Sequence, residues 1–168
     1  MSGIIGLPCN ESARFSEFYA SLCGLHLPLD WVIRPDKKTA VHPLIQCRFA
    51  SLAHTLNVIA DFFMKSGREW LFLTNDDHIY PPDTILRLLS HGKDYVTGLY
   101  LKKEMPFEPI LYDKLDEFGR AVPKLLKPYE SGLIPITASG DGCLLLHRRV
   151  LEAIPQPWWE MSDSENPD

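Results

Sequence analysis

Residues 70–103 read WLFLTNDDHIYPPDTILRLLSHGKDYVTGLYLKK, and this stretch decides the expected fold. A strand is expected over residues 69–74 (EWLFLT), whose apolar residues do not alternate with polar ones, as in a strand covered by helices on both faces. Two prolines at positions 81 and 82 then start a helix that ends at Gly92. A further strand is expected over residues 94–100. Strand, helix and strand at this spacing predict a βαβ unit with parallel strands and a right-handed crossover.

The segments on either side extend this pattern. A helix is expected over residues 48–65, because apolar residues recur there on one face. The shorter predicted elements are strands over residues 3–7, 29–33, 109–112 (within an irregular excursion) and 134–146 (interrupted by a glycine turn), and a helix over residues 148–154. We therefore expect an α/β fold with one Rossmann-like domain and a mostly parallel central sheet, over residues 1–160, followed by a polar tail over residues 161–168.

The composition limits the classes of function. The 168 residues carry a formal net charge of −5, which argues against a general nucleic-acid coat, because such a protein needs a basic surface. The four cysteines are widely spaced with no CxxC pair, so neither a thiolate zinc site nor a disulfide framework is indicated. The start of the chain has no basic flank, and no apolar stretch reaches membrane-spanning length. We therefore expect a cytoplasmic protein without a membrane span.

Asp76 and Asp77 follow the apolar strand directly. In an open α/β sheet, ligands bind beyond the carboxyl ends of the strands, so both carboxylates are expected at the binding edge. Two adjacent carboxylates repel each other unless a cation offsets the repulsion, and oxygen ligands favour Mg²⁺ or Mn²⁺ over zinc. The alternative interpretation is that both are turn and cap residues before the following helix.

Two segments resemble glycosyltransferases with the A-type nucleotide-sugar fold, in particular the family-2-like enzymes of bacteria and phages. The first is residues 70–103, with an apolar strand, aspartates followed by His78, a proline-started helix and a strand that ends in Gly-x-Tyr. The second is residues 138–159, ASGDGCLLLHRRVLEAIPQPWW, which is similar to the Gly-x-Gly-Cys segment, basic pair and Pro-Trp of that family. Arg48 stands where the family often carries Arg-Asn. The resemblance implies inverting transfer of a sugar from a nucleoside-diphosphate sugar, such as a UDP-sugar.

The resemblance also implies roles for single residues. Asp77 would bind Mn²⁺ or Mg²⁺ that bridges to the donor diphosphate, and Asp76 would contact the ribose or the metal shell. His78 would either contact the metal or support the site as a structural residue. The residues expected to hold the donor are Pro8, Asp36, Arg48, Asp76, Gly140 and Gly142. Arg48 would face the diphosphate, because a metal and an arginine stabilise the negative charge that develops on the leaving group. A solvated helix-start residue is the alternative interpretation of Arg48.

Two acidic residues are candidates for the general base. Relatives carry a Glu-Asp segment after their Pro-Trp segment, and Glu165 lies where the stretch 164–166 resembles its start. Asn166 would take the position of the base but cannot accept a proton, so we expect weak or absent transfer and intact donor binding. Asp141 is the other candidate, as a substitute base or sugar contact, or else as a turn aspartate. Asn75 replaces an aspartate of many relatives and removes one charge beside the metal.

Two other functions fit parts of the sequence. The first is a shortened or degenerate domain that binds a nucleotide sugar without transferring it. The second is a nucleotidyltransferase, which would need a glycine-rich basic loop after the first strand, and residues 7–15 (LPCNESARF) lack one. The acceptor stays open among a modified DNA base, a protein, a lipid and a glycan, and so does the oligomeric state.

Overall fold

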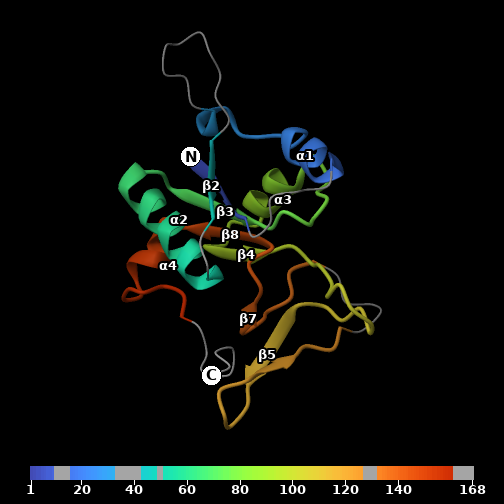
Figure 1. Cartoon of the computed structure of the whole chain (residues 1–168). Helices are drawn as coiled ribbons and strands as arrows, with labels where there is room; N and C mark the ends of the chain where they lie inside the picture. The colour runs from blue at the N-terminus through green and yellow to red at the C-terminus, as the bar shows by residue number, and fades with distance from the viewer. Residues whose placement is uncertain (10–15, 33–42, 49–50, 127–131, 161–168) are drawn as a thin grey trace.

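The computed structural model describes residues 1–168 apart from residues 10–15, 33–42, 49–50, 127–131 and 161–168 (Figure 1). Within this part, the main sheet has five strands in the order β2-β1-β3-β8-β4. They are β1 (Gly3–Pro8), β2 (Leu44–Cys47), β3 (Trp70–Thr74), β4 (Tyr95–Thr97) and β8 (Cys143–His147). A second sheet, in the order β6-β5-β7, consists of β5 (Leu111–Leu115), β6 (Ala121–Pro123) and β7 (Ala138–Ser139).

Helices cover both faces of the main sheet. They are α1 (Ser16–Cys23), α2 (Leu52–Ser66), α3 (Thr84–Ser90) and α4 (Arg148–Glu152), with a 3₁₀ turn, η1 (Leu29–Trp31). In Figure 1, α1 and α3 lie on one side of the sheet, and α2 and α4 lie on the other. The second sheet lies below the main sheet in this view, and the chain passes from β7 into β8.

The prediction of a mostly parallel, Rossmann-like sheet is wrong, because the fold is mixed α/β. Among the described strands, β1 pairs in parallel with β2 and β3, whereas the other four pairings are antiparallel. β8 lies antiparallel between β3 and β4, so the predicted β3-α3-β4 unit is not a pair of neighbouring parallel strands. An apolar strand covered on both faces has the same composition in either direction, which is why the sequence pattern did not reveal this insertion.

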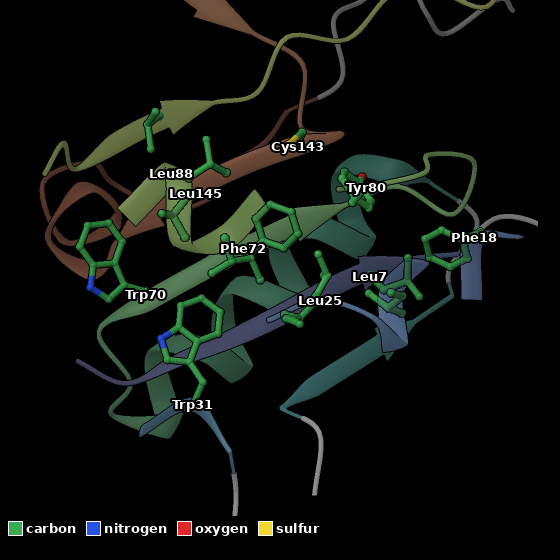
Figure 2. Close-up of a cluster of buried hydrophobic side chains, with 14 of the residues drawn as sticks. Leu7, Phe18, Leu25, Trp31, Trp70, Phe72, Tyr80, Leu88, Cys143 and Leu145 are labelled. Carbon is green, nitrogen blue, oxygen red and sulfur yellow. The ribbon is translucent and has the colours of Figure 1, made fainter. Parts of the chain in front are cut away.

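Alternate side chains of the main sheet pack into two separate clusters, one on each face. In the first, Phe72 of β3 and Leu145 of β8 belong with Phe18 of α1 and Leu88 of α3 (Figure 2). The second contains Leu71, Leu73, Leu144 and Leu146 of the sheet with Ile59, Phe63 and Leu151 of α2 and α4. Burial of each such side chain contributes roughly 1.5–3 kcal/mol, so both clusters fix β3 and β8 firmly.

The helix predicted over residues 48–65 is present but begins later. Ser51 is its N-cap, with a side-chain oxygen that accepts a hydrogen bond from the backbone N–H of His54 at 3.1 Å. Gly67 ends it in the left-handed conformation, with φ of 70°. Arg48 therefore follows β2 and does not begin a helix, which corrects the position expected for it.

The structure also corrects the strand expected over residues 29–33 and shows a different strand beside β1. Residues 29–33 were expected to form a strand, but Leu29–Trp31 is a 3₁₀ turn that places the Trp31 indole in the core. A Cβ on Gly3 would overlap this indole, so glycine is required there for the close approach. The sheet position next to β1 is taken by Leu44–Cys47, a strand that the sequence pattern did not indicate. The expected strand over residues 3–7 is confirmed as β1.

Candidate functional site

The candidate site lies where β3 ends and β8 begins. Thr74, the last residue of β3, pairs with Cys143, the first residue of β8. The turn at Asp76 and Asp77 therefore lies beside the glycine turn at residues 140–142. The structure brings together at one sheet edge two groups of residues that are about 65 positions apart in the sequence.

Two tyrosines hold the glycine turn in place. The Tyr80 hydroxyl accepts a hydrogen bond from Thr74 Oγ1 at 2.7 Å and donates one to the backbone carbonyl of Gly142. The Tyr100 hydroxyl accepts a hydrogen bond from the backbone N–H of Gly142 at 3.1 Å. Burial raises the pKa of both tyrosines above the ordinary value, so their hydroxyls stay protonated. Both tyrosines are parts of the site that the sequence analysis missed.

The two glycines of this turn are required by close packing. A Cβ on Gly142 would stand 2.9 Å from Cε1 of His78, and a Cβ on Gly140 would overlap the Tyr100 hydroxyl. The His78 ring in turn packs edge-on against Tyr100, with ring centroids 4.8 Å apart, and stacks with Tyr80 at 6.0 Å. The close packing of His78 and Tyr100 therefore explains why glycine is needed at positions 140 and 142, whether or not a sugar binds there.

Asp77 already has positive charge beside it. Nδ1 of His78 lies 2.5 Å from Oδ1 of Asp77, without the angle of a hydrogen bond, and Nζ of Lys103 forms an ion pair with Oδ2. The His78 imidazole and then the Lys103 ammonium hold the pKa of Asp77 well below its ordinary value. Asp77 is therefore a permanently ionised carboxylate at physiological pH. Lys103 is the second contribution that the sequence analysis missed.

Asp141 has the opposite surroundings. Burial raises the pKa of its carboxyl, and Asp77 adds to this effect, while backbone hydrogen bonding, His78 and Asn75 oppose it. Its Oδ2 is buried and has no hydrogen-bond partner among the residues that the structure describes. A buried carboxylate oxygen without a partner is costly and marks a position where a hydrogen-bond donor would be favourable.

A divalent cation fits this site only if the phosphates of a bound molecule and water complete its coordination shell. Across the described ranges, no three His, Cys, Asp or Glu side chains are grouped so as to hold a metal ion. Mg²⁺ is commonly bound through one or two carboxylates while phosphate oxygens and water complete its shell. Asp77, with Asp76 next to it, matches this mode. The ion would take the place of the Lys103 ammonium, whose side chain is 75% exposed and can move away.

Two other residues that were predicted to bind the donor, Pro8 and Arg48, lie along the sheet edge that holds the candidate site. Pro8 ends β1, is buried, and pairs with Cys47 at the end of β2, with exposed Arg48 next in the chain. Because β1, β2 and β3 run in parallel, Pro8 and Arg48 lie at the same sheet edge as Asp76. Asp36 and Glu165 lie outside the described residues, so their predicted roles stay predictions.

No protein-family model matches the chain, and no curated protein matches it. Solved structures that resemble it include A197 from STIV, with a TM-score of 0.59 and 16% sequence identity. The match covers 94% of this chain and 70% of that chain. At this identity the likeness concerns the fold alone. Among the described helices, none combines the length and the apolar character that crossing a membrane requires.

Proposed function

We propose that the chain binds a nucleoside-diphosphate sugar at the edge where β3 ends and β8 begins, and transfers the sugar to an acceptor. One observation carries the proposal: Asp76 and Asp77 meet the Gly140–Gly142 turn there, and that turn holds a second acidic group, Asp141. The resemblance of residues 70–103 and 138–159 to glycosyltransferases agrees with this assignment, and both segments contribute to the same site.

The donor diphosphate would lie beside Asp77. Its two phosphates carry negative charge, so they need cations between them and this carboxylate. When bound, Mg²⁺ or Mn²⁺ would neutralise charge that develops on the leaving diphosphate. Asp77 would hold that ion, with Asp76 beside it, and Lys103 would turn from the carboxylate towards the phosphates. Arg48, exposed at the same sheet edge, would add a second positive charge.

Asp141 would serve as the general base. An acceptor oxygen forms a bond to the anomeric carbon while the bond from that carbon to the diphosphate oxygen breaks. The bonding electron pair leaves with the nucleoside diphosphate, and the acceptor proton goes to the Asp141 carboxylate. A single displacement of this kind inverts the configuration at the anomeric carbon. Burial raises the pKa of Asp141, which makes its carboxylate a better proton acceptor.

Titration of UDP into the protein, with and without Mn²⁺, tests donor binding by calorimetry. We expect Mn²⁺-dependent UDP binding by the wild type. Asp77→Asn should weaken it by about tenfold or more, because a charged ligand contact is lost. Asp83→Asn is a matched control, since Asp83 is an exposed carboxylate at the start of α3 whose side chain makes no capping hydrogen bond. Equal Mn²⁺-dependent binding by wild type and Asp77→Asn would show that the proposal is wrong.

The cytoplasmic location expected from the sequence belongs with this proposal and stays a prediction.

A further inference from the structure

A separate cavity of about 310 Å³ lies against the α2 and α4 side of β8, next to the glycine turn. Leu52 and Leu56 of α2 and Leu144 and Leu146 of β8 form part of its wall. Trp158 and Trp159, which follow α4, form another part. Apolar side chains therefore surround most of the space. The volume lies at the small end of the usual range for ligand pockets, roughly 300–1,000 Å³.

The tryptophan wall is fixed by Asn57 of α2. Asn57 Oδ1 accepts hydrogen bonds from the backbone N–H groups of Trp158 at 2.8 Å and Trp159 at 3.2 Å, and its Nδ2 donates to the carbonyl of Trp159 at 2.7 Å. The indole N–H of Trp158 donates to the carbonyl of Leu151 at 2.9 Å. Because this N–H is already used, Trp158 offers a ligand only its apolar ring.

The polar groups of the cavity are gathered at one end. Asp141 and Gly140 lie there, together with the hydroxyls of Ser139 and Tyr95, which are 2.8 Å apart and hydrogen-bonded to each other. Asp141 thus places a carboxylate residue in this polar end of the wall, although its oxygen Oδ2 is itself covered by protein. The cavity therefore has a carboxylate residue and two hydroxyl groups at one end and hydrocarbon elsewhere.

This arrangement discriminates between classes of acceptor. A glycan would place hydroxyls against the leucine side chains as well as at the polar end, and the hydroxyls that face leucine would lose their hydrogen bonds to water. A molecule with one hydroxyl and an apolar body would place the hydroxyl against Asp141 and the body against the apolar wall. We propose that the cavity binds the acceptor and that the acceptor is an alcohol with an apolar body. This inference rests on the proposed transfer reaction, in which Asp141 takes the proton of that hydroxyl.

Three small molecules probe the cavity directly: 1-octanol, heptyl methyl ether, which has the same number of heavy atoms but no hydroxyl, and methyl glucoside. We expect 1-octanol to bind at least about tenfold more tightly than the ether, because only the alcohol donates a hydrogen bond to a charged group. Methyl glucoside should bind more weakly than 1-octanol. In Asp141→Leu, the alcohol and the ether should bind equally.

A second variant locates the binding without changing Asp141. Ile154 lines the cavity and is 46% exposed, so Ile154→Glu places a charge at the rim without disturbing the core. It should weaken both 1-octanol and the ether. Leu86→Glu on α3 is the matched control, because Leu86 is 41% exposed and does not line this cavity. It should leave both affinities unchanged.

The outcomes separate this inference from the donor proposal when UDP is titrated into the same samples. UDP binding without 1-octanol binding overturns the cavity assignment and leaves the donor site standing. Binding of 1-octanol without UDP binding supports the apolar cavity and removes the transferase proposal. Equal affinity for alcohol and ether in the wild type, or tighter binding of methyl glucoside, overturns the assignment of the acceptor class.

Discussion

Asp77 and Asp141 lie at the same edge of the main sheet, on neighbouring turns, yet their surroundings are opposite. Asp77 is partly open and has His78 and Lys103 beside it, which lower its pKa. Among the described residues, Asp141 has no such cation paired with it, and burial raises its pKa, although each of the two carboxyl groups keeps one buried oxygen without a hydrogen-bond partner there. When two neighbouring acids have pKa values driven apart, one stays ionised while the other is suited to exchange a proton. Under the proposed function, this difference suits Asp77 to charge compensation and Asp141 to proton transfer.

Replacing Asp141 should have the largest effect on activity. Asp141→Asn keeps the shape of the side chain but removes its ability to accept a proton. We expect acceptor-dependent turnover of the donor to fall by about 10²–10⁴-fold, the usual contribution of a general base, while UDP affinity stays within about twofold. Kinetics and calorimetry on the same samples measure both quantities.

Glu165 supplies the control for this experiment, because the sequence resemblance offers it as the alternative acid. Glu165→Gln should leave turnover unchanged if Asp141 is the base. A large loss of turnover in Glu165→Gln together with normal turnover in Asp141→Asn would reverse the assignment. If the wild type binds the donor but transfers nothing, the chain is a nucleotide-sugar-binding protein without this activity.

The sequence predicted those parts of the fold in which a local pattern determines the structure. The apolar run of β3 and the helical stripe of α2 were both recognised, and the aspartates were expected directly after β3, where they lie. The position of β8 was not predicted, because an apolar strand carries no information about its direction or its neighbours. β2 has four residues and weak burial, so it gives no periodic signal.

Part of the candidate site could be predicted for the same reason. Asp76, Asp77 and Asp141 belong to short motifs that can be read from neighbouring residues. Lys103 reaches Asp77 only because the chain folds back after β4, and nothing local distinguishes it from Lys102, which pairs with Glu108 instead. Contacts that depend on tertiary structure leave no periodic signal in the sequence.

The two acids should also affect stability in opposite directions. The lowered pKa of Asp77 means that its ionisation stabilises the fold above the ordinary value of 3.8, and this contribution is lost as the pH falls through the folded-state pKa. Asp77→Asn should therefore reduce the free energy of unfolding at pH 7 by about 1 kcal/mol or less, since Lys103 is largely exposed. The deficit should shrink as the pH falls below that value.

For Asp141 the sign is reversed. Its raised pKa means that the folded state binds a proton more readily than the unfolded state, so ionisation destabilises the fold at every pH above the folded-state pKa. Asp141→Asn should raise the free energy of unfolding at pH 7, and the gain should disappear towards pH 4. Urea denaturation at several pH values measures both variants. A loss of stability in both at pH 7 would show that the contrast between the two acids is wrong.

The smallest expected effect concerns the cation at Asp77. In the structure Lys103 competes for the carboxylate that a divalent cation would use, so Lys103→Gln should strengthen binding of Mn²⁺ alone. An ion pair whose lysine is largely exposed contributes about 0.2–1 kcal/mol, which corresponds to an increase of roughly 1.5- to 5-fold in Mn²⁺ affinity. Lys102→Gln removes the same charge from the adjacent position, where the ammonium pairs with Glu108 at 2.8 Å, and should change Mn²⁺ binding less. If Lys103→Gln instead leaves Mn²⁺ binding unchanged and weakens UDP binding in the absence of metal, the ammonium itself neutralises the diphosphate. Asp77 would then hold Lys103 in position for the phosphates, and a divalent cation would have no place in the site.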